Sequence, residues 1–154
     1  GNSELTEKLY DVGYHDIVCI DFSSVVIRQM AERNADRRPG IQWLEMDATD
    51  MSFGADHFDL IIDKGFLDTL TCVPLKERSA TVQAYLAEAR RVLRPGGVHL
   101  CFSFEHDHLK TLRHADLEVT VEAQPASKWC QGSFAYICRK RLDVQASFSL
   151  NELD

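Results

Sequence analysis

The sequence lacks long apolar runs, paired cysteines and an excess of positive charge. No stretch approaches the roughly 20 apolar residues that a membrane-spanning helix requires. The five cysteines are odd in number and none stands in a Cys-x-x-Cys pair, which predicts reduced thiols and a cytoplasmic protein. The 24 acidic residues outnumber the 17 lysines and arginines, and the net charge is −7. This balance argues against non-specific binding to nucleic acid or to an anionic membrane.

The spacings of common metal sites are missing as well. The six histidines include no His-Glu-x-x-His segment, so we expect no metal ligand. No side chain stands out from the sequence as a general base. We therefore expect residues that bind and position substrates, and we name no catalytic residue.

Helical and strand patterns alternate along the 154 residues, a length that suits one domain. Short apolar runs predict buried parallel strands at Asp16–Asp21, Ile41–Met46, Phe58–Asp63 and Val98–Phe104. Two later segments, Leu117–Glu122 and Phe134–Arg139, alternate apolar and polar residues, as half-buried antiparallel strands do. We expect an α/β, Rossmann-like domain over residues 1–141, followed by a tail over 142–154. Its sheet is mostly parallel with helices on both faces, and an antiparallel strand pair lies at its C-terminal end.

The helices fall between these strands. The pattern predicts helices over Glu4–Val12, from Ser23 or Ser24 to Arg33, and near Asp107–Arg113. The strongest helix is Ser79–Leu93, and the turn Arg94-Pro95-Gly96-Gly97 ends it. Its apolar residues recur at helical spacing, which places six side chains in the core: Val82, Tyr85, Leu86, Ala89, Val92 and Leu93.

Acidic residues close three of the predicted strands, at Asp21, Asp47 and Asp63. Because ligands of open parallel sheets bind beyond the carboxyl ends of the strands, we expect these carboxylates to line one crevice. Asp21 also follows Gly1 by 20 residues, with a predicted helix between them. A glycine turn, a helix and an acid at about this distance indicate a nucleotide site, in which the acid binds ribose hydroxyls.

Four stretches of the sequence resemble class I methyltransferases that use S-adenosylmethionine. They are Gly1-Asn2-Ser3-Glu4-Leu5, Asp16-Ile17-Val18-Cys19-Ile20-Asp21-Phe22-Ser23, Glu45-Met46-Asp47-Ala48 and Arg90-Arg91-Val92-Leu93-Arg94-Pro95-Gly96-Gly97. A narrower resemblance joins the first stretch with Val25-Val26-Ile27 and Asp63-Lys64-Gly65-Phe66-Leu67-Asp68. These segments are similar to the methyltransferase-like proteins that methylate lysine or the N-terminus of elongation factor 1A.

The resemblance implies S-adenosylmethionine as cofactor and assigns roles to individual residues. Those implied to bind the cofactor are Gly1, Asp21, Phe22, Asp47, Ala48, Asp63 and Lys64. Those implied to face the methyl acceptor are Gly65, Phe66 and Leu67. Asp68 is read as a helix cap or turn residue rather than a catalyst. Phe66 departs from the family, whose members tend to have a smaller polar residue there. The acceptor of this protein can therefore differ from that of its relatives.

The first strand of the family has no counterpart in this sequence, which begins inside the glycine-rich motif. Without that central strand, the strands at 16–21 and 58–63 would each have an unpaired edge or would pair with each other. We expect that the sequence is a fragment of a longer protein. A shortened relative that binds cofactor or partner without catalysis is the alternative.

The methyl acceptor is expected to be a protein amine, a lysine or N-terminal amine of elongation factor 1A or a related translation protein. A small-molecule acceptor stays open, because the loops that build such pockets vary between proteins of one fold. A nicotinamide-dependent oxidoreductase would also use a ribose-binding acid. The antiparallel end and the Asp47 loop favour the methyltransferase.

Overall fold

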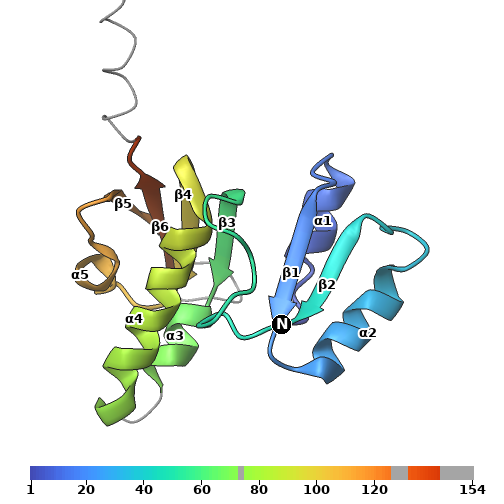
Figure 1. Cartoon of the computed structure of the whole chain (residues 1–154), viewed down its shortest axis with the longest axis horizontal. Coiled ribbons are helices and arrows are strands. Elements are labelled where there is room, and N and C mark those ends of the chain that lie inside the picture. Colours follow the sequence, from blue (N-terminus) through green and yellow to red (C-terminus); the bar gives the residue numbers. More distant parts are fainter. Residues whose placement is uncertain (73–74, 126–131, 143–154) are drawn as a thin grey trace, which may run out of the picture. The chain divides into compact units, whose positions relative to one another are not determined.

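The computed structural model describes residues 1–72, 75–125 and 132–142, so all but the first residue of the expected tail lies outside the described part. Contacts divide the chain into two compact units, residues 1–52 and 53–154 (Figure 1). The described strands form two sheets, one in each unit. Strands at 17–21 and 58–64, which would flank the family's first strand, belong to different sheets.

The first unit contains two helices and a two-stranded parallel sheet. Its elements are α1 (Leu5–Asp11), β1 (Ile17–Asp21), α2 (Ser24–Asn34) and β2 (Ile41–Glu45). The register pairs Ile17 with Ile41 and Asp21 with Glu45, so both strands end at the same edge. All four elements were expected from the sequence, within one residue at most ends.

Local chemistry explains where α2 begins and how the helices of this unit meet. The Ser23 hydroxyl accepts the Val26 N–H at 3.4 Å, as an N-cap residue does. Buried Glu7 of α1 accepts hydrogen bonds from Arg33 at 2.9 Å and from Asn34 at 3.2 Å, both on α2. These contacts place the two helices against each other, so the charge of the buried carboxylate is matched by a guanidinium.

The second unit contains a four-stranded sheet in the order β3-β4-β6-β5. Its elements are β3 (Phe58–Lys64), α3 (Phe66–Thr71), α4 (Leu75–Val92), β4 (Leu93–Ser103), α5 (Leu109–Leu112), β5 (Leu117–Gln124) and β6 (Ser133–Lys140). β3 and β4 are parallel, whereas β6 is antiparallel to both β4 and β5. The expected antiparallel pair is therefore confirmed.

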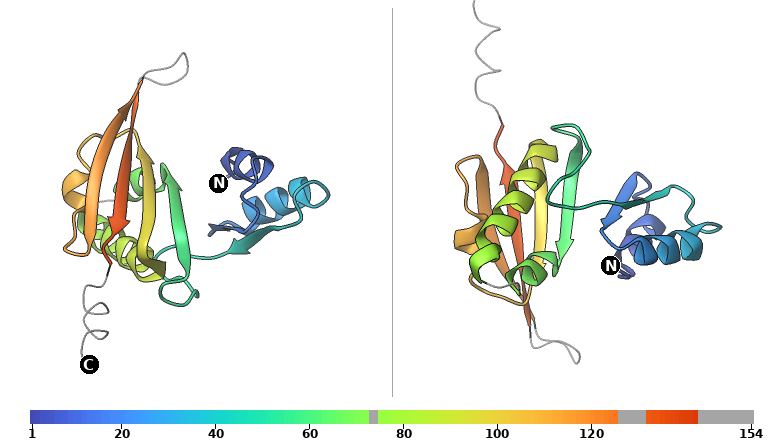
Figure 2. Two further views of the ribbon diagram at one scale, coloured as in Figure 1. Left: turned by 90° about the horizontal axis from the view of Figure 1, so that it is seen from above. Right: turned by 60° about the horizontal axis from the view of Figure 1, so that its bottom comes forward.

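Helix α4 supplies much of the core of the second unit. Figure 2 shows α4 and α3 against one face of the four-stranded sheet, and α3 and α4 also contact each other. All six side chains that the helical spacing places inward are at most 4% exposed: Val82, Tyr85, Leu86, Ala89, Val92 and Leu93. Burial of these apolar groups is the main source of stability for such a layer.

Two features of this unit differ from the sequence prediction. Helix α3 was not expected, because six residues directly after a strand give too short a pattern to reveal a helical period. Strand β4 begins at Leu93, so the expected turn Arg94–Gly97 lies inside the strand as an irregularity in its pairing with β3. Gly96 has φ of +79°, a conformation that glycine adopts without steric cost.

Candidate functional site

Two of the predicted cofactor acids lie together in the first unit. Asp21 ends β1 and pairs in register with Glu45 at the end of β2, two residues before Asp47. The Met46 N–H also donates to the Asp21 carbonyl at 3.0 Å, which extends the pairing past β2. The carboxyl ends of neighbouring parallel strands are where open α/β sheets bind nucleotides. The structure thus brings Asp21 and Asp47 to one edge, as the sequence predicts.

The Asp21 side chain is fixed but accessible. Its carboxylate is 17% exposed, and Oδ1 accepts the Ser23 N–H at 2.8 Å. The Gly1 amino group contacts Oδ2. Burial acts to raise the pKa of Asp21, and the hydrogen bond from the Ser23 N–H acts to lower it. An ionised carboxylate with its plane held in place is suited to accept hydrogen bonds from two adjacent hydroxyls.

The neighbouring residues have the exposure that an adenosine group needs. The Phe22 side chain is 78% exposed directly after β1, which leaves its ring free to lie against a base. Asp47 is exposed and Ala48 is half-buried. Asp47 Oδ1 accepts the Thr49 N–H and hydroxyl, both at 2.8 Å, so its loop is held by its own side chain. The donors and acceptors at this edge fit the ribose and adenine of S-adenosylmethionine.

The third predicted acid, Asp63, has a different environment. It is 4% exposed in the second unit and accepts the Phe66 N–H at 2.7 Å and the Leu67 N–H at 3.2 Å. The Tyr85 hydroxyl donates at 3.0 Å to Oδ2, the oxygen that also accepts the Leu67 N–H. Burial raises the pKa of Asp63 despite these hydrogen bonds. The expectation that this carboxylate lines an open crevice is therefore wrong, because the side chain caps α3 from inside the core.

The residues expected to face the substrate in the turn after Asp63 differ in their exposure to solvent. Lys64 is exposed, and Gly65 has φ of +75° at the N-cap of α3. The Phe66 ring is half-buried and packs edge-on against Tyr85, with ring centroids 4.9 Å apart. Leu67 is 0% exposed, so the prediction that it faces the acceptor is wrong. Helix α3 starts at Phe66 and turns the next side chain into the core.

Sequence reasoning missed a polar cluster at the carboxyl end of β4. The carboxylate of Asp68, in α3, accepts hydrogen bonds from the Ser103 hydroxyl, from the Phe104 N–H at 3.0 Å and from His108 Nε2 at 2.9 Å. Ser103 and His108 are 2% and 6% exposed. Burial acts to raise the pKa of Asp68, but these hydrogen bonds outweigh it and lower the pKa. The sequence feature that could have indicated this cluster is Ser103, a polar residue at a strand position that faces the core.

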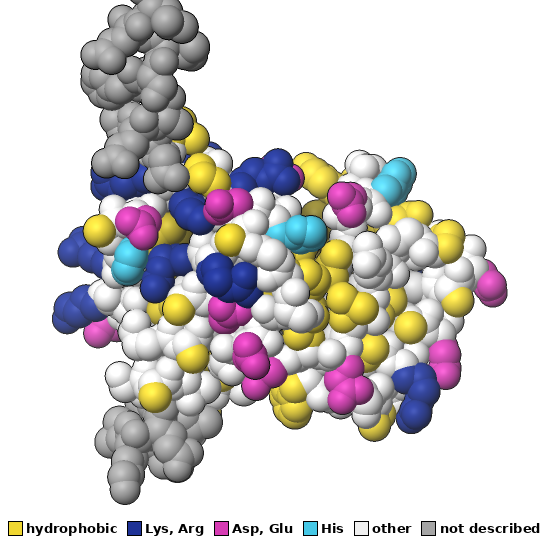
Figure 3. Space-filling model, viewed as in Figure 1, with side chains coloured by type: hydrophobic (Ala, Val, Ile, Leu, Met, Phe, Trp, Pro, Cys, Tyr) yellow, Lys and Arg dark blue, Asp and Glu magenta, His cyan; other side chains and the backbone are white. Residues whose placement is uncertain are grey.

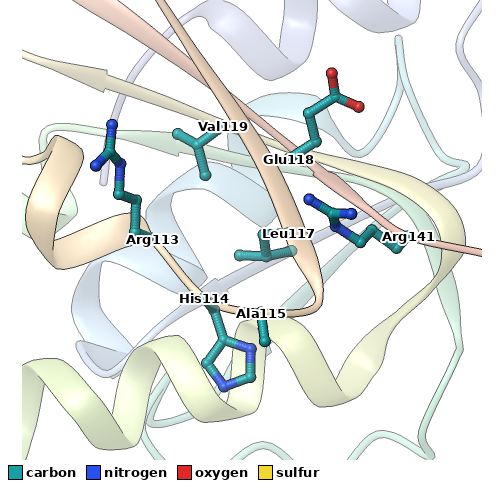
Figure 4. A pocket seen from close by; sticks show the side chains of 7 residues that line it. All are labelled: Arg113, His114, Ala115, Leu117, Glu118, Val119 and Arg141. Atoms are coloured by element: carbon teal, nitrogen blue, oxygen red, sulfur yellow. The ribbon is translucent and has the colours of Figure 1, made fainter.

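A shallow cavity of about 500 Å³ lies elsewhere in the second unit (Figure 4). It is lined by Arg113, His114, Ala115, Leu117, Glu118, Val119 and Arg141. Lys and Arg side chains gather over this unit on the face drawn in Figure 3. Leu117 starts β5, which is parallel to β4, so the cavity lies at the amino ends of these strands. None of the predicted site residues lines it, and ligands of such sheets bind at the opposite edge.

Curated relatives share half of the matched residues with this chain. The bovine and human proteins named eEF1A lysine and N-terminal methyltransferase are each 50% identical over 109 residues. The match covers 71% of this chain and 16% of each relative, so the chain spans a small part of their length.

Solved structures of low sequence identity share the fold. A SAM-dependent methyltransferase from Methanosarcina mazei has a TM-score of 0.70 and 19% identity, covering 93% of this chain and 90% of that one. The 1,6-didemethyltoxoflavin-N1-methyltransferase of Burkholderia thailandensis, with bound S-adenosylhomocysteine, has a TM-score of 0.65 and 18% identity. That match covers 92% of this chain and 68% of the other. The expected Rossmann-like α/β class is confirmed.

A family model described as "Methyltransferase domain" matches residues 1–101, which include β1, β2, β3 and most of β4. The match contains every residue that the sequence predicts to bind the cofactor or to face the acceptor. The chain therefore belongs to the methyltransferase domain family.

Proposed function

We propose that the protein transfers a methyl group from S-adenosylmethionine to a protein amine, with a lysine or the N-terminus of elongation factor 1A as the acceptor. The observation that carries the proposal is the pairing of Asp21 with Glu45, which puts Asp47, two residues later, near the same strand edge as Asp21 and the exposed Phe22. The 50% identity to proteins named for methylation of this elongation factor supports the acceptor.

The residues at this edge bind and position rather than react. S-adenosylmethionine supplies an electrophilic methyl group on a sulfonium. Asp21 accepts the ribose hydroxyls, Asp47 and the Ala48 N–H bind adenine, and Phe22 covers its face. The family resemblance implies that Gly1 allows close approach to the methionine part of the cofactor, and it implies the same part as the ligand of Asp63 and Lys64. Such placement is itself catalytic, because alignment of reacting groups removes much of the entropic barrier to an in-line displacement.

The acceptor amine loses a proton before its lone pair attacks the methyl carbon. We assign no base to this step, and release of the proton to solvent suffices. Gly65 and Phe66, in the turn after β3, face the acceptor. The half-buried Phe66 ring offers an apolar wall to the methylene stem of a lysine.

We further propose that residues 1–141 act as one methyltransferase domain and that residues 142–154 are a tail. The four free cysteines that the structure describes, Cys19, Cys72, Cys101 and Cys138, are compatible with a reducing compartment. The cytoplasm is the site of translation elongation, and we place the enzyme there. Within the described part, no helix combines the length and apolar character needed to cross a membrane.

Incubation of the full-length protein with methyl-labelled S-adenosylmethionine and purified elongation factor 1A tests the proposal. Label on the elongation factor, located by mass spectrometry at a lysine or the N-terminus, is the expected result. A parallel incubation with a cell extract separates the alternatives. Label found in small molecules alone would refute the protein acceptor, and cofactor binding without any transfer would identify a non-catalytic relative.

A further inference from the structure

The loop between β4 and α5, residues 104–107, is exposed along its length but anchored at both ends. Phe104, Glu105, His106 and Asp107 are all exposed, and the Phe104 side chain is 69% exposed. Single exposed apolar residues are common on protein surfaces and need no explanation by themselves. The anchoring of this loop is what distinguishes Phe104.

Buried groups hold the backbone of the loop from below. The Phe104 N–H donates to Asp68, which Ser103 and His108 also bind. The Glu105 carbonyl accepts the Tyr136 hydroxyl at 2.8 Å, and Tyr136 is 0% exposed. The Glu105 N–H donates to the Ser103 hydroxyl at 2.9 Å. An aromatic ring is therefore presented to solvent on a backbone that is already ordered, which lowers the entropic cost of binding.

The loop continues the edge that carries the acceptor-facing turn. Lys64 is paired in register with Phe102, and the Gly65 N–H donates to the Phe102 carbonyl at 2.8 Å. Phe104 follows Phe102 by two residues. The ring thus extends from the same carboxyl edge of β3 and β4 as Lys64 and Gly65.

The acidic residues next to Phe104 in the sequence would attract a cationic ligand. Glu105 and Asp107 follow Phe104 with exposed side chains, and no ion pair joins either one to another residue in the described part of the chain. An ammonium over an aromatic face is attracted by the ring quadrupole, and its methylene stem packs on the same surface. Nearby carboxylates raise the local concentration of a cation.

We propose that Phe104 is a specificity-determining residue that receives the side chain of a lysine acceptor against its ring face. The inference deepens the proposed methyl transfer to a protein amine and rests on it. It predicts that the loop recognises the acceptor and leaves the affinity for the cofactor unchanged.

Kinetics of the full-length protein with purified elongation factor 1A test the role of the ring. Phe104→Ala is expected to raise KM for the elongation factor by about tenfold, the order expected for a cation–π contact, and to leave the dissociation constant of S-adenosylhomocysteine unchanged. Phe104→Leu keeps apolar bulk and should behave like Phe104→Ala, whereas Phe104→Tyr should restore the parent KM. Val121→Ala, at a 43% exposed position of β5, is the matched control and should change neither constant.

Equal KM values for the parent and Phe104→Ala would overturn the inference while leaving the proposed function intact. A direct measurement keeps it testable when no transfer to the elongation factor is seen. Titration with millimolar Nα-acetyl-lysine methyl ester should shift the Phe104 ring resonances in NMR spectra. The absence of that shift would overturn the inference without reference to turnover, and the absence of turnover alone would refute the proposed function.

Discussion

The carboxyl ends of β1 and β3 are alike in sequence, yet their aspartates differ in burial and in hydrogen-bond partners. Each strand is a short apolar run closed by an acid, Asp21 in one and Asp63 in the other. At β1, Ser23 caps the following helix with its own hydroxyl. At β3, the N-cap of the following helix is Gly65, which has no side chain, and Asp63 accepts the helix N–H groups instead. The residue at the cap decides whether the strand-end acid is left for a ligand.

The protonation behaviour of the two acids follows the same division. Burial raises the pKa of Asp63, whereas the partly exposed Asp21 accepts the Ser23 N–H, which acts to lower its pKa. A group held ionised near solvent suits ligand binding. The burial of Asp63 disfavours its charged form, so its hydrogen-bond partners in the fold have to compensate for the lost contact with water.

The largest effect is expected for Asp63→Ala. The substitution leaves two backbone N–H groups without their acceptor inside the core and leaves the Tyr85 hydroxyl with His99 Nε2 as its other hydrogen-bond partner, and we expect a loss of about 3 kcal/mol in the free energy of unfolding. Denaturant titration followed by circular dichroism measures it. Asp59→Ala, on the same strand, removes only a surface ion pair with Arg94 and should cost less than about 1 kcal/mol. Similar losses for the two variants would contradict a structural role for Asp63.

Asp21→Ala should act on binding instead. We expect the affinity for S-adenosylmethionine to fall by roughly 1.5–3 kcal/mol, the range for hydrogen bonds to a charged group. The free energy of unfolding should change far less than for Asp63→Ala. Calorimetric titration of the full-length protein measures the affinity, with the exposed Asp16→Ala as control. If the variant binds as tightly as the parent, Asp21 is a structural residue, and it does not differ in role from Asp63.

The glycine at the N-cap of α3 gives a smaller effect. Gly65 has φ of +75°, and a Cβ there would meet no atom within 4 Å. Gly65→Ala should therefore cost about 1 kcal/mol through backbone strain alone. Gly54→Ala, also without a close neighbour and without a positive φ, should be near neutral in the same denaturant titration. A neutral Gly65→Ala would show that the α3 cap is less constrained than its conformation indicates.

The smallest effect is a difference in how stability depends on pH. Asp63 holds its proton more tightly in the folded state, so the stability of the parent relative to Asp63→Asn should fall as pH rises above about 3.9, the ordinary aspartate value. Asp68 has a lowered pKa, so the parent relative to Asp68→Asn should lose stability as pH falls through that region. Unfolding titrations at a series of pH values measure both. If the stability of the parent relative to each variant changed in the same direction with pH, the two aspartates would not have opposite pKa shifts.

The sequence predicts the elements whose signals are local. The helical period of α4 and the Ser23 cap of α2 come from neighbouring residues, and the structure contains both helices, although α4 begins at Leu75, four residues before the expected Ser79. Helix α3 was missed because its cap, Asp63, belongs to the preceding strand and its six residues show no clear period. Asp21 and Asp47 could be placed at a strand edge from their spacing alone. The burial of Asp63 depends on Tyr85, 22 residues later, and the Asp68 cluster on partners 35 and 40 residues away.

The position of β6 has a consequence for synthesis of the chain. β6 is the last strand that the structure describes, yet it lies between β4 and β5 in the second sheet. A growing chain that has reached residue 125 contains both neighbours of this strand but not the strand itself. Until residues 133–140 leave the ribosome, the inner edge of β4 keeps its N–H and C=O groups unpaired and open to other strands. The nascent protein therefore passes through an interval in which this edge of β4 can pair with strands of other chains before β6 covers it.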